Sequence, residues 1–350
     1  MKMKSRKADA KASTSKATDA WVEKPALIRQ FVEQRPDYER LCDEVQYILK
    51  KRLTQRGVEI STVSSRAKTL NSFLEKIQRK SYANPLREMS DVAGVRVVHL
   101  YIRDIKLIEK IIKEEFDLIE KVDKFTDKKP NQFGYGAIHF VVRLRKEISG
   151  ARYEDIKRLK CEIQVRTVLQ DAWAIIDHHL VYKTESAVPT SLQRKLNGLA
   201  GLFETADDQF EQIRKQRKEY VAEMRESSVS ENSFLGHEVN ADSLLEYLKW
   251  KFPGVPVEKW EGQFKIAQEK VDFLKYRTLK QIDGIMDQTK HSRKKLEHEL
   301  PNINRLGDKV PSCIELALAL SLTDNDYWRE VALPTDWRPV IQSRRKFTLA

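Results

Sequence analysis

The sequence is poor in cysteine and has no long apolar run. Its three cysteines, Cys42, Cys161 and Cys313, form no CxxC pair, which argues against a zinc ribbon, and so sparse a set is typical of a reducing compartment. No apolar run reaches the ~18 residues that a membrane span needs, and the basic N-terminus is not followed by the apolar segment of a secretory signal. We therefore expect a soluble, cytoplasmic protein without a membrane partner.

Large apolar side chains are also nearly absent from residues 1–20, which consist mainly of Lys, Ala, Ser and Thr. Such a segment buries too little apolar surface to offset the entropy of ordering it, so we expect a disordered basic tail. What the chain has in excess is positive charge, with 64 Lys and Arg against 52 Asp and Glu and a formal net charge of +12. This balance favours a polyanionic ligand such as a nucleotide or RNA, without choosing between them.

Hydrophobic periodicity predicts a first domain that mixes helices with strands. Helices are expected over residues 21–57, 65–80, 105–116 and 168–183. Strands are expected over residues 91–102, 118–125, 137–145 and 159–167. This combination is typical of an α/β or α+β domain with a central sheet.

The rest of the chain is predicted to be mainly helical. The polar stretch 226–238 is the best linker candidate. It would separate a first domain with helical extensions, over 21–225, from a helical C-terminal region of unknown role, over 239–350. Two domains agree with the total length of 350 residues, since a domain usually has ~100–200 residues.

A cluster of polar residues belongs to the helix expected over residues 65–80. The residues that would share one end and one face of it are Arg66, Lys68, Ser72 and Lys76. Cations held in this way can grip a triphosphate, with arginine as a fork and lysine as a point charge. A solvated helix face is the alternative interpretation, because charged runs usually face water.

Two carboxylates belong to expected strands. Asp91 opens the strand over 91–102, where a carboxylate is either a magnesium ligand or a strand boundary. In the stretch CEIQVRT, three polar residues alternate with apolar ones and therefore share one face: Glu162, Gln164 and Arg166. That face is either exposed or the floor of an active site, where Glu162 beside a magnesium ion could take a proton from a hydroxyl.

Two further stretches carry rings that need an explanation. In NQFGYGAIHFVV, Tyr135 lies between two glycines at the mouth of a strand, which suits the stacking of a flat ligand better than a core. In WAIIDHHLVYK, His178 lies on an expected helix close to Lys183. A histidine on a helix is usually structural, and the absence of HExxH argues against a metalloprotease.

Taken together, five motifs in order resemble the RelA/SpoT-type nucleotide pyrophosphokinases, the synthetases of the (p)ppGpp alarmones. The motifs are RAKTLNSFLEK, DVAGVRVV, FGYGAIH, EIQVRT and WAIIDHHLVYK, within about residues 40–215. The resemblance implies an α+β fold with a nucleotidyltransferase-like mixed β-sheet flanked by helices. The mainly helical C-terminal region would follow it.

The resemblance also implies a role for each group of residues. The ATP phosphates are expected on Arg66, Lys68, Ser72 and Lys76. A Mg²⁺ cofactor is expected on the two catalytic carboxylates, Asp91 and Glu162, with Glu162 as the general base. The acceptor is expected on Tyr135, stacked on its guanine, and on His139, Gln164, Arg166, His178 and Lys183. Arg96 is expected near the phosphates or in an ion pair below the site.

The implied reaction moves the β,γ-pyrophosphate of ATP to the 3′-hydroxyl of GDP or GTP, as in small alarmone synthetases without a hydrolase domain. The expected partners are ATP and GTP or GDP, with a homo-oligomer as a further candidate. Two departures from the family pattern leave the acceptor open: Gly136 follows the tyrosine, and two residues separate Asn131 from Gly134. One alternative is therefore a toxic relative that pyrophosphorylates the 3′ end of tRNA. The other is a non-catalytic nucleotide sensor.

Overall fold

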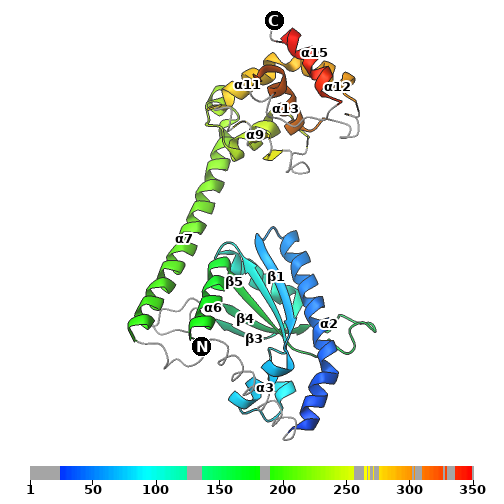
Figure 1. Ribbon diagram of the computed structural model, residues 1–350, viewed down its shortest axis with the longest axis vertical. Helices are drawn as coiled ribbons and strands as arrows, with labels where there is room; N and C mark the ends of the chain where they lie inside the picture. The colour runs from blue at the N-terminus through cyan, green and yellow to red at the C-terminus, as the bar shows by residue number, and fades with distance from the viewer. Residues whose placement is uncertain are drawn as a thin grey trace, which may run out of the picture. The chain divides into compact units, whose positions relative to one another are not determined.

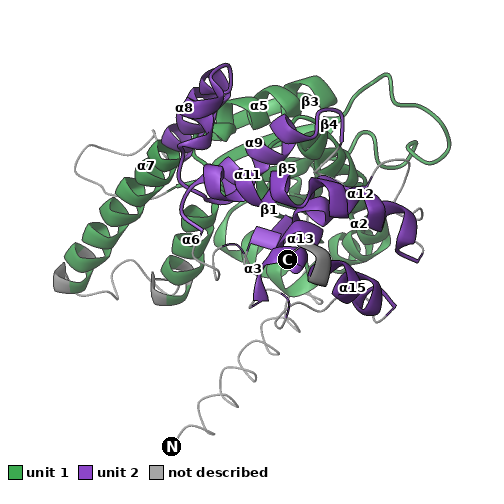
Figure 2. Ribbon diagram, turned by 90° about the horizontal axis from the view of Figure 1, so that it is seen from above, with its two compact units in different colours: residues 1–213 green, residues 214–350 purple. Residues whose placement is uncertain are grey.

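The computed structural model describes residues 24–123, 136–181, 190–255, 276–301, 310–325 and 336–348, with a few residues between these ranges. The tail expected over residues 1–20 lies outside them. The chain forms two compact units, Met1–Ile213 and Arg214–Ala350 (Figure 1, Figure 2).

The first unit is built on a five-stranded sheet with the order β1-β2-β5-β4-β3. Its strands are β1 (Ile60–Ala67), β2 (Ala93–His99), β3 (Phe116–Asp123), β4 (Ile138–Leu144) and β5 (Cys161–Thr167). β2 and β5 pair in parallel, and the other neighbours pair antiparallel. All four expected strands are present, which confirms the α+β class with a mixed sheet.

Helices flank this sheet. They are α2 (Pro25–Gln55), α3 (Leu70–Arg79), α4 (Pro85–Glu88), α5 (Asp104–Glu115), α6 (Val168–Val181) and the first part of α7 (Thr190–Ser227). The long helix α2 packs on β1, β2 and α5, and Figure 1 shows it lying along the sheet. Helix α6 follows β5 directly and contacts both β5 and β2.

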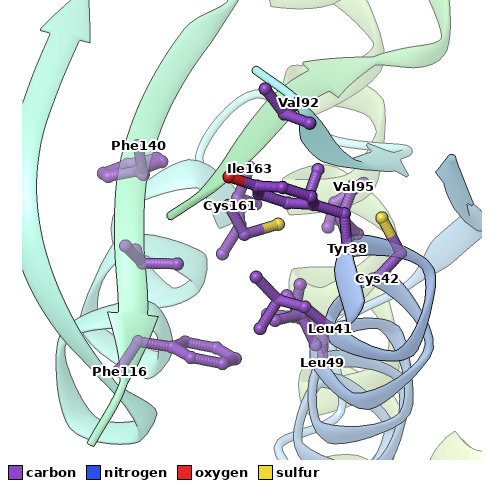
Figure 3. Packing of buried hydrophobic residues seen from close by; sticks show 14 of the residues in the cluster. Tyr38, Leu41, Cys42, Leu49, Val92, Val95, Phe116, Phe140, Cys161 and Ile163 are labelled. Carbon is purple, nitrogen blue, oxygen red and sulfur yellow. The ribbon is translucent and has the colours of Figure 1, made fainter. Parts of the chain in front are cut away.

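An apolar core lies between α2 and one face of the sheet. The three apolar residues of β5 are buried there: Cys161, Ile163 and Val165. Figure 3 shows Leu41 and Leu49 of α2 lying close to this strand. Because fully burying a leucine side chain contributes ~1.5–3 kcal/mol, this packing fixes which face of the sheet is apolar. The opposite face, called the polar face below, carries the remaining β5 side chains, as the alternation predicted.

The helix expected over residues 65–80 is only partly present, and the prediction was wrong for its first residues. Residues 65–67 belong to the edge strand β1, which pairs with β2, and α3 begins at Leu70. Thr69 caps α3, since its hydroxyl oxygen accepts from the backbone N–H of Ser72. The helical spacing of Leu70, Phe73, Leu74 and Ile77 was real, but it lies wholly within α3.

The second unit is helical, as expected. Its helices are the end of α7, α8 (Glu231–Leu235), α9 (Ala241–Lys251), α11 (Leu279–Gln288), α12 (Lys290–Glu299), α13 (Ser312–Thr323) and α15 (Arg338–Thr348). The stretch 226–238 is not an open linker, because Phe234 and Leu235 of α8 are buried in this unit's core. The division between the units falls at Ile213, within α7. Among the described residues, no helix has the length and apolarity to cross a membrane.

Candidate active site

The strand register gathers polar side chains from four segments of the chain on the polar face. Gly94 of β2 lies between Arg66 of β1 and Glu162 of β5. In the next row, Arg96 of β2 lies beside Gln164 of β5, which in turn lies beside His139 of β4. Residues that pair across strands point to the same side of a sheet, so these rows form one continuous floor.

Gly94 leaves this floor open between Arg66 and Glu162. A Cβ built on Gly94 would meet only the backbone oxygens of Arg66, at 3.7 Å, and Glu162, at 4.0 Å. Both separations are ordinary van der Waals contacts, so the protein itself would tolerate a side chain here. The space above Gly94 is therefore available to a ligand that lies between a guanidinium and a carboxylate.

At the edge of the floor, two lysines share one carboxylate oxygen. The Nζ atoms of Lys68 and Lys76 lie 2.9 Å and 2.7 Å from Oδ2 of Asp91, and we call these three residues the lysine–carboxylate triad. Burial alone would raise the pKa of the Asp91 carboxyl, but the hydrogen bonds and charges of Lys76 and Lys68 hold it below its ordinary value. The second oxygen, Oδ1, is buried and has no hydrogen-bond partner among the described residues.

Glu162 is held at both of its carboxylate oxygens. His139 Nδ1 lies 3.0 Å from Oε1, and Nε2 of Gln164 donates to Oε2 at 2.8 Å. An ionised carboxylate only accepts hydrogen bonds, so His139 is the donor in this pair. Burial raises the pKa of Glu162 and the nearby charge of Asp91 adds to that, but the bonds from His139 and Gln164 outweigh both and leave it lowered. The carboxylate is consequently ionised and oriented at neutral pH.

A second ion cluster supports the floor from helix α6. Oδ1 of Asp171 lies 3.1 Å from a guanidinium nitrogen of Arg96 and 3.5 Å from one of Arg166. Arg166 also donates to Oε1 of Gln164 at 3.2 Å, which connects this cluster to Glu162. Burial and the charge of Arg96 lower the pKa of Arg166, whose buried Nε atom has no partner in the described part of the chain. Two guanidinium groups thus share one carboxylate, and the cluster keeps an excess of positive charge.

Arg66 and Ser72, the other two residues expected at the ATP phosphates, have surroundings that differ from those of the lysines. Arg66 is exposed on the strand β1, and its side chain makes no ion pair or hydrogen bond with any described residue. Ser72 lies in the first turn of α3, where its hydroxyl accepts a hydrogen bond from Thr69 at 3.0 Å. A strand, a connection and a helix therefore supply this group, in place of the single helix that was expected.

The strand register places Arg66, His139, Glu162 and Gln164 on the polar face, although part of the acceptor group lies outside the described residues. That part consists of Tyr135, Lys183 and the side chain of His178. Arg96 is in an ion pair, one of the two situations expected for it. The contact of His139 with Glu162 and the clamp made by Asp171 were not anticipated, because both depend on pairing between distant segments.

The carboxylates fit a small, hard cation. Magnesium in proteins is usually held by one or two carboxylates and completed by water and substrate phosphates. Asp91 offers the buried, unpartnered Oδ1, and Glu162 interacts with Asp91 through its charge. No group of three or more His, Cys, Asp or Glu suited to a metal occurs in the described part of the chain, so the protein alone would leave such a cation incompletely coordinated.

Comparison with known proteins places this site in context. Residues 65–187 match the model of the region found in RelA / SpoT proteins. The chain is 31% identical to GTP pyrophosphokinase YwaC of Bacillus subtilis over 163 residues, which are 45% of this chain and 75% of that protein. It is 30% identical to GTP pyrophosphokinase YjbM of the same organism over 169 residues, 47% of this chain and 76% of that protein.

A solved structure of small alarmone synthetase 1 from Bacillus subtilis, bound to its product pppGpp, is also similar. The sequence identity is 26% and the TM-score is 0.45, and the match covers 54% of this chain and 99% of that one.

Proposed function

This chain belongs to the RelA/SpoT family, and we propose that it is a GTP pyrophosphokinase that moves the β,γ-pyrophosphate of ATP to the 3′-hydroxyl of GTP or GDP and releases AMP. Two relatives at about 30% identity carry that name. The observation that carries the proposal is the floor around Gly94, where an ionised carboxylate faces a set of cations across an open space.

The cations would bind and align the ATP phosphates. Transfer of a phosphoryl group depends mainly on positioning and on stabilisation of negative charge. Lys68 and Lys76 provide point charges at one edge of the floor, and the exposed guanidinium of Arg66 provides a fork beside them. Ser72, in the first turn of α3, would add a hydroxyl and a helix N-terminus, both suited to a phosphate oxygen.

Glu162 would accept the proton of the 3′-hydroxyl as that oxygen attacks the β-phosphorus of ATP. A general base must be ionised, and the lowered pKa of Glu162 meets this requirement at neutral pH. The bond from oxygen to hydrogen breaks as the bond from oxygen to phosphorus forms, and AMP leaves with the electrons of the bond that joined the α- and β-phosphates. Mg²⁺, held by Asp91 and Glu162, would supply charge neutralisation for the phosphates.

We assign His139 to the orientation of Glu162. The resemblance to the family implied a contact with the acceptor, but the described contact of this ring is with the carboxylate. The ring is buried and lies on β4, in register with Gln164, so its position is set by the sheet. With His139 on one oxygen and Gln164 on the other, the carboxylate has little freedom to rotate away from the hydroxyl.

The acceptor would lie on the remaining part of the floor. Tyr135 would stack on the guanine, and His178 and Lys183 would contact its ribose or phosphates. Gln164 and Arg166 belong to the network below Glu162, and Arg166 retains a buried N–H without a partner. The excess positive charge of that cluster supports an acceptor that carries phosphates.

The experiment that tests the proposal is incubation of the purified chain with γ-labelled ATP, Mg²⁺ and one acceptor at a time. We expect AMP to form with GDP or GTP and the label to move to that nucleotide. Label on deacylated tRNA, with none on GDP or GTP, would favour the tRNA alternative, which the net charge of +12 also suits. Failure to form AMP with any acceptor would favour a nucleotide sensor and contradict the proposal.

A further inference from the structure

The lysine–carboxylate triad ties both lysines to a single carboxylate oxygen. Both Nζ atoms lie within hydrogen-bond distance of the same atom, Oδ2 of Asp91. The side chains of Lys68 and Lys76 are only 15% and 18% exposed, so their charges are weakly screened by water. A phosphate that reaches these lysines therefore competes with a carboxylate that already holds both of them.

The same carboxylate also repels an incoming nucleotide. ATP without a metal carries about four negative charges at neutral pH, and Asp91 would face them at short range. A metal-bound nucleotide meets a different situation, because the buried Oδ1 of Asp91 is an acceptor that no described residue partners. With a dication beside this carboxylate, Lys68 and Lys76 would be repelled from Oδ2 and attracted to the phosphates that arrive with it.

Glu162 lacks this arrangement although it is also a carboxylate of the site. The donors to its oxygens are the ring of His139 and the amide of Gln164, and no lysine among the described residues pairs with it. Removal of its charge would change the general electrostatics of the site without releasing a lysine. Glu162 therefore provides a matched control for Asp91.

We propose that Asp91 makes the site selective for metal-bound ATP. Asp91 holds both phosphate-binding lysines until a divalent cation binds to this carboxylate in their place. This inference rests on the proposed function, since it takes Lys68 and Lys76 as ligands of ATP phosphates. It gives Asp91 a role in choosing the substrate species in addition to holding the cation.

The test is calorimetric titration of the full chain with ATP, in EDTA and in Mg²⁺. We expect the wild-type protein to bind ATP weakly in EDTA and much more tightly in Mg²⁺. Asp91→Asn should bind metal-free ATP at least ~10-fold more tightly than the wild type, because two charge-assisted donors are released, and should gain little from Mg²⁺. Glu162→Gln should show a clearly smaller change in EDTA.

A measurement on the wild-type protein avoids dependence on the folding of Asp91→Asn. Mg²⁺ alone, without nucleotide, should increase the rate at which an acetylating reagent modifies Lys68 and Lys76, read by mass spectrometry. The largely exposed Lys110 serves as the internal control. An unchanged rate at both lysines, or a folded Asp91→Asn that binds metal-free ATP no better than the wild type, would overturn the proposal.

The test of the role of Asp91 and the test of the proposed activity can fail independently of each other. If the chain forms AMP with GDP or GTP but Asp91→Asn does not gain metal-free affinity, the role of Asp91 in selection is wrong and the activity stands. If no acceptor yields AMP but Asp91→Asn gains metal-free affinity, the activity is wrong and the selection stands.

Discussion

Replacement of His139 by alanine tests whether this ring orients the catalytic carboxylate. The contact that would be lost is the 3.0 Å hydrogen bond from Nδ1 to Oε1 of Glu162. A hydrogen bond to a charged group contributes about 1.5–3 kcal/mol, which corresponds to a decrease of about 10- to 100-fold in kcat. The KM for the acceptor should change little, because the ring would act through Glu162.

The pH dependence should change in a defined direction. The bond from His139 is one of two that lower the pKa of Glu162 against the effect of burial, so its removal raises that pKa. Since the base must be ionised, the acidic limb of the profile of kcat against pH should move to higher pH. A role confined to packing would leave this limb in place.

Two matched variants complete the assay, which is steady-state AMP release with GDP. His139→Asn can place an amide N–H near the position of Nδ1 and should recover part of the rate. Val141→Ala removes a buried side chain on the same strand, in register with Glu162, and controls for lost packing. The reasoning is refuted if His139→Ala raises only the KM for the acceptor, or lowers kcat no more than Val141→Ala does.

Three further predictions address the floor, the fold and the acceptor. Gly94→Ala should fold as stably as the wild type, because the added Cβ meets no atom closer than 3.7 Å. Its kcat/KM should nevertheless fall by about 10- to 100-fold, because the methyl group would misplace the substrate. Full activity would show that nothing binds above Gly94. Burial raises the pKa of Asp207 from 3.8 to about 7, and the charge of Asp208 adds to this, so the folded state loses stability as pH rises through this range. Asp207→Asn should therefore raise the free energy of unfolding in urea by up to about 4 kcal/mol at pH 8 and by clearly less at pH 5. An equal change at both pH values would contradict this prediction. Tyr135→Ala should raise the KM for the acceptor by the equivalent of about 1–3 kcal/mol of stacking, and an unchanged KM would count against the assignment.

The polar face could be predicted from sequence where a strand alternates strictly. The stretch Cys161–Thr167 does so, and its apolar residues are buried while Glu162, Gln164 and Arg166 are partly exposed. The edge strand β1 was missed because only Val63 among its residues is buried and its register shifts between Ile60 and Thr62. A strand that pairs on one side and faces water along most of its length carries too little hydrophobic pattern to be recognised.

The contacts that give the site its chemistry could not be predicted in the same way. Lys68 and Asp91 are 23 positions apart, as are His139 and Glu162, and each pair meets only because of the sheet register. Sequence periodicity indicates which face a residue occupies, but not which residue lies opposite on the next strand. The resemblance to a family indicated the candidate residues, and the structure supplied the pairing of those that it describes.

The most direct test of the account is the single-turnover rate of pyrophosphate transfer in Glu162→Gln, with folding checked by circular dichroism. The substitution keeps the size of the side chain and removes its ability to accept the proton of the 3′-hydroxyl. We predict a folded protein whose rate is at least ~100-fold below that of the wild type. A folded Glu162→Gln protein that transfers pyrophosphate at the wild-type rate would contradict the assignment of this carboxylate as the base.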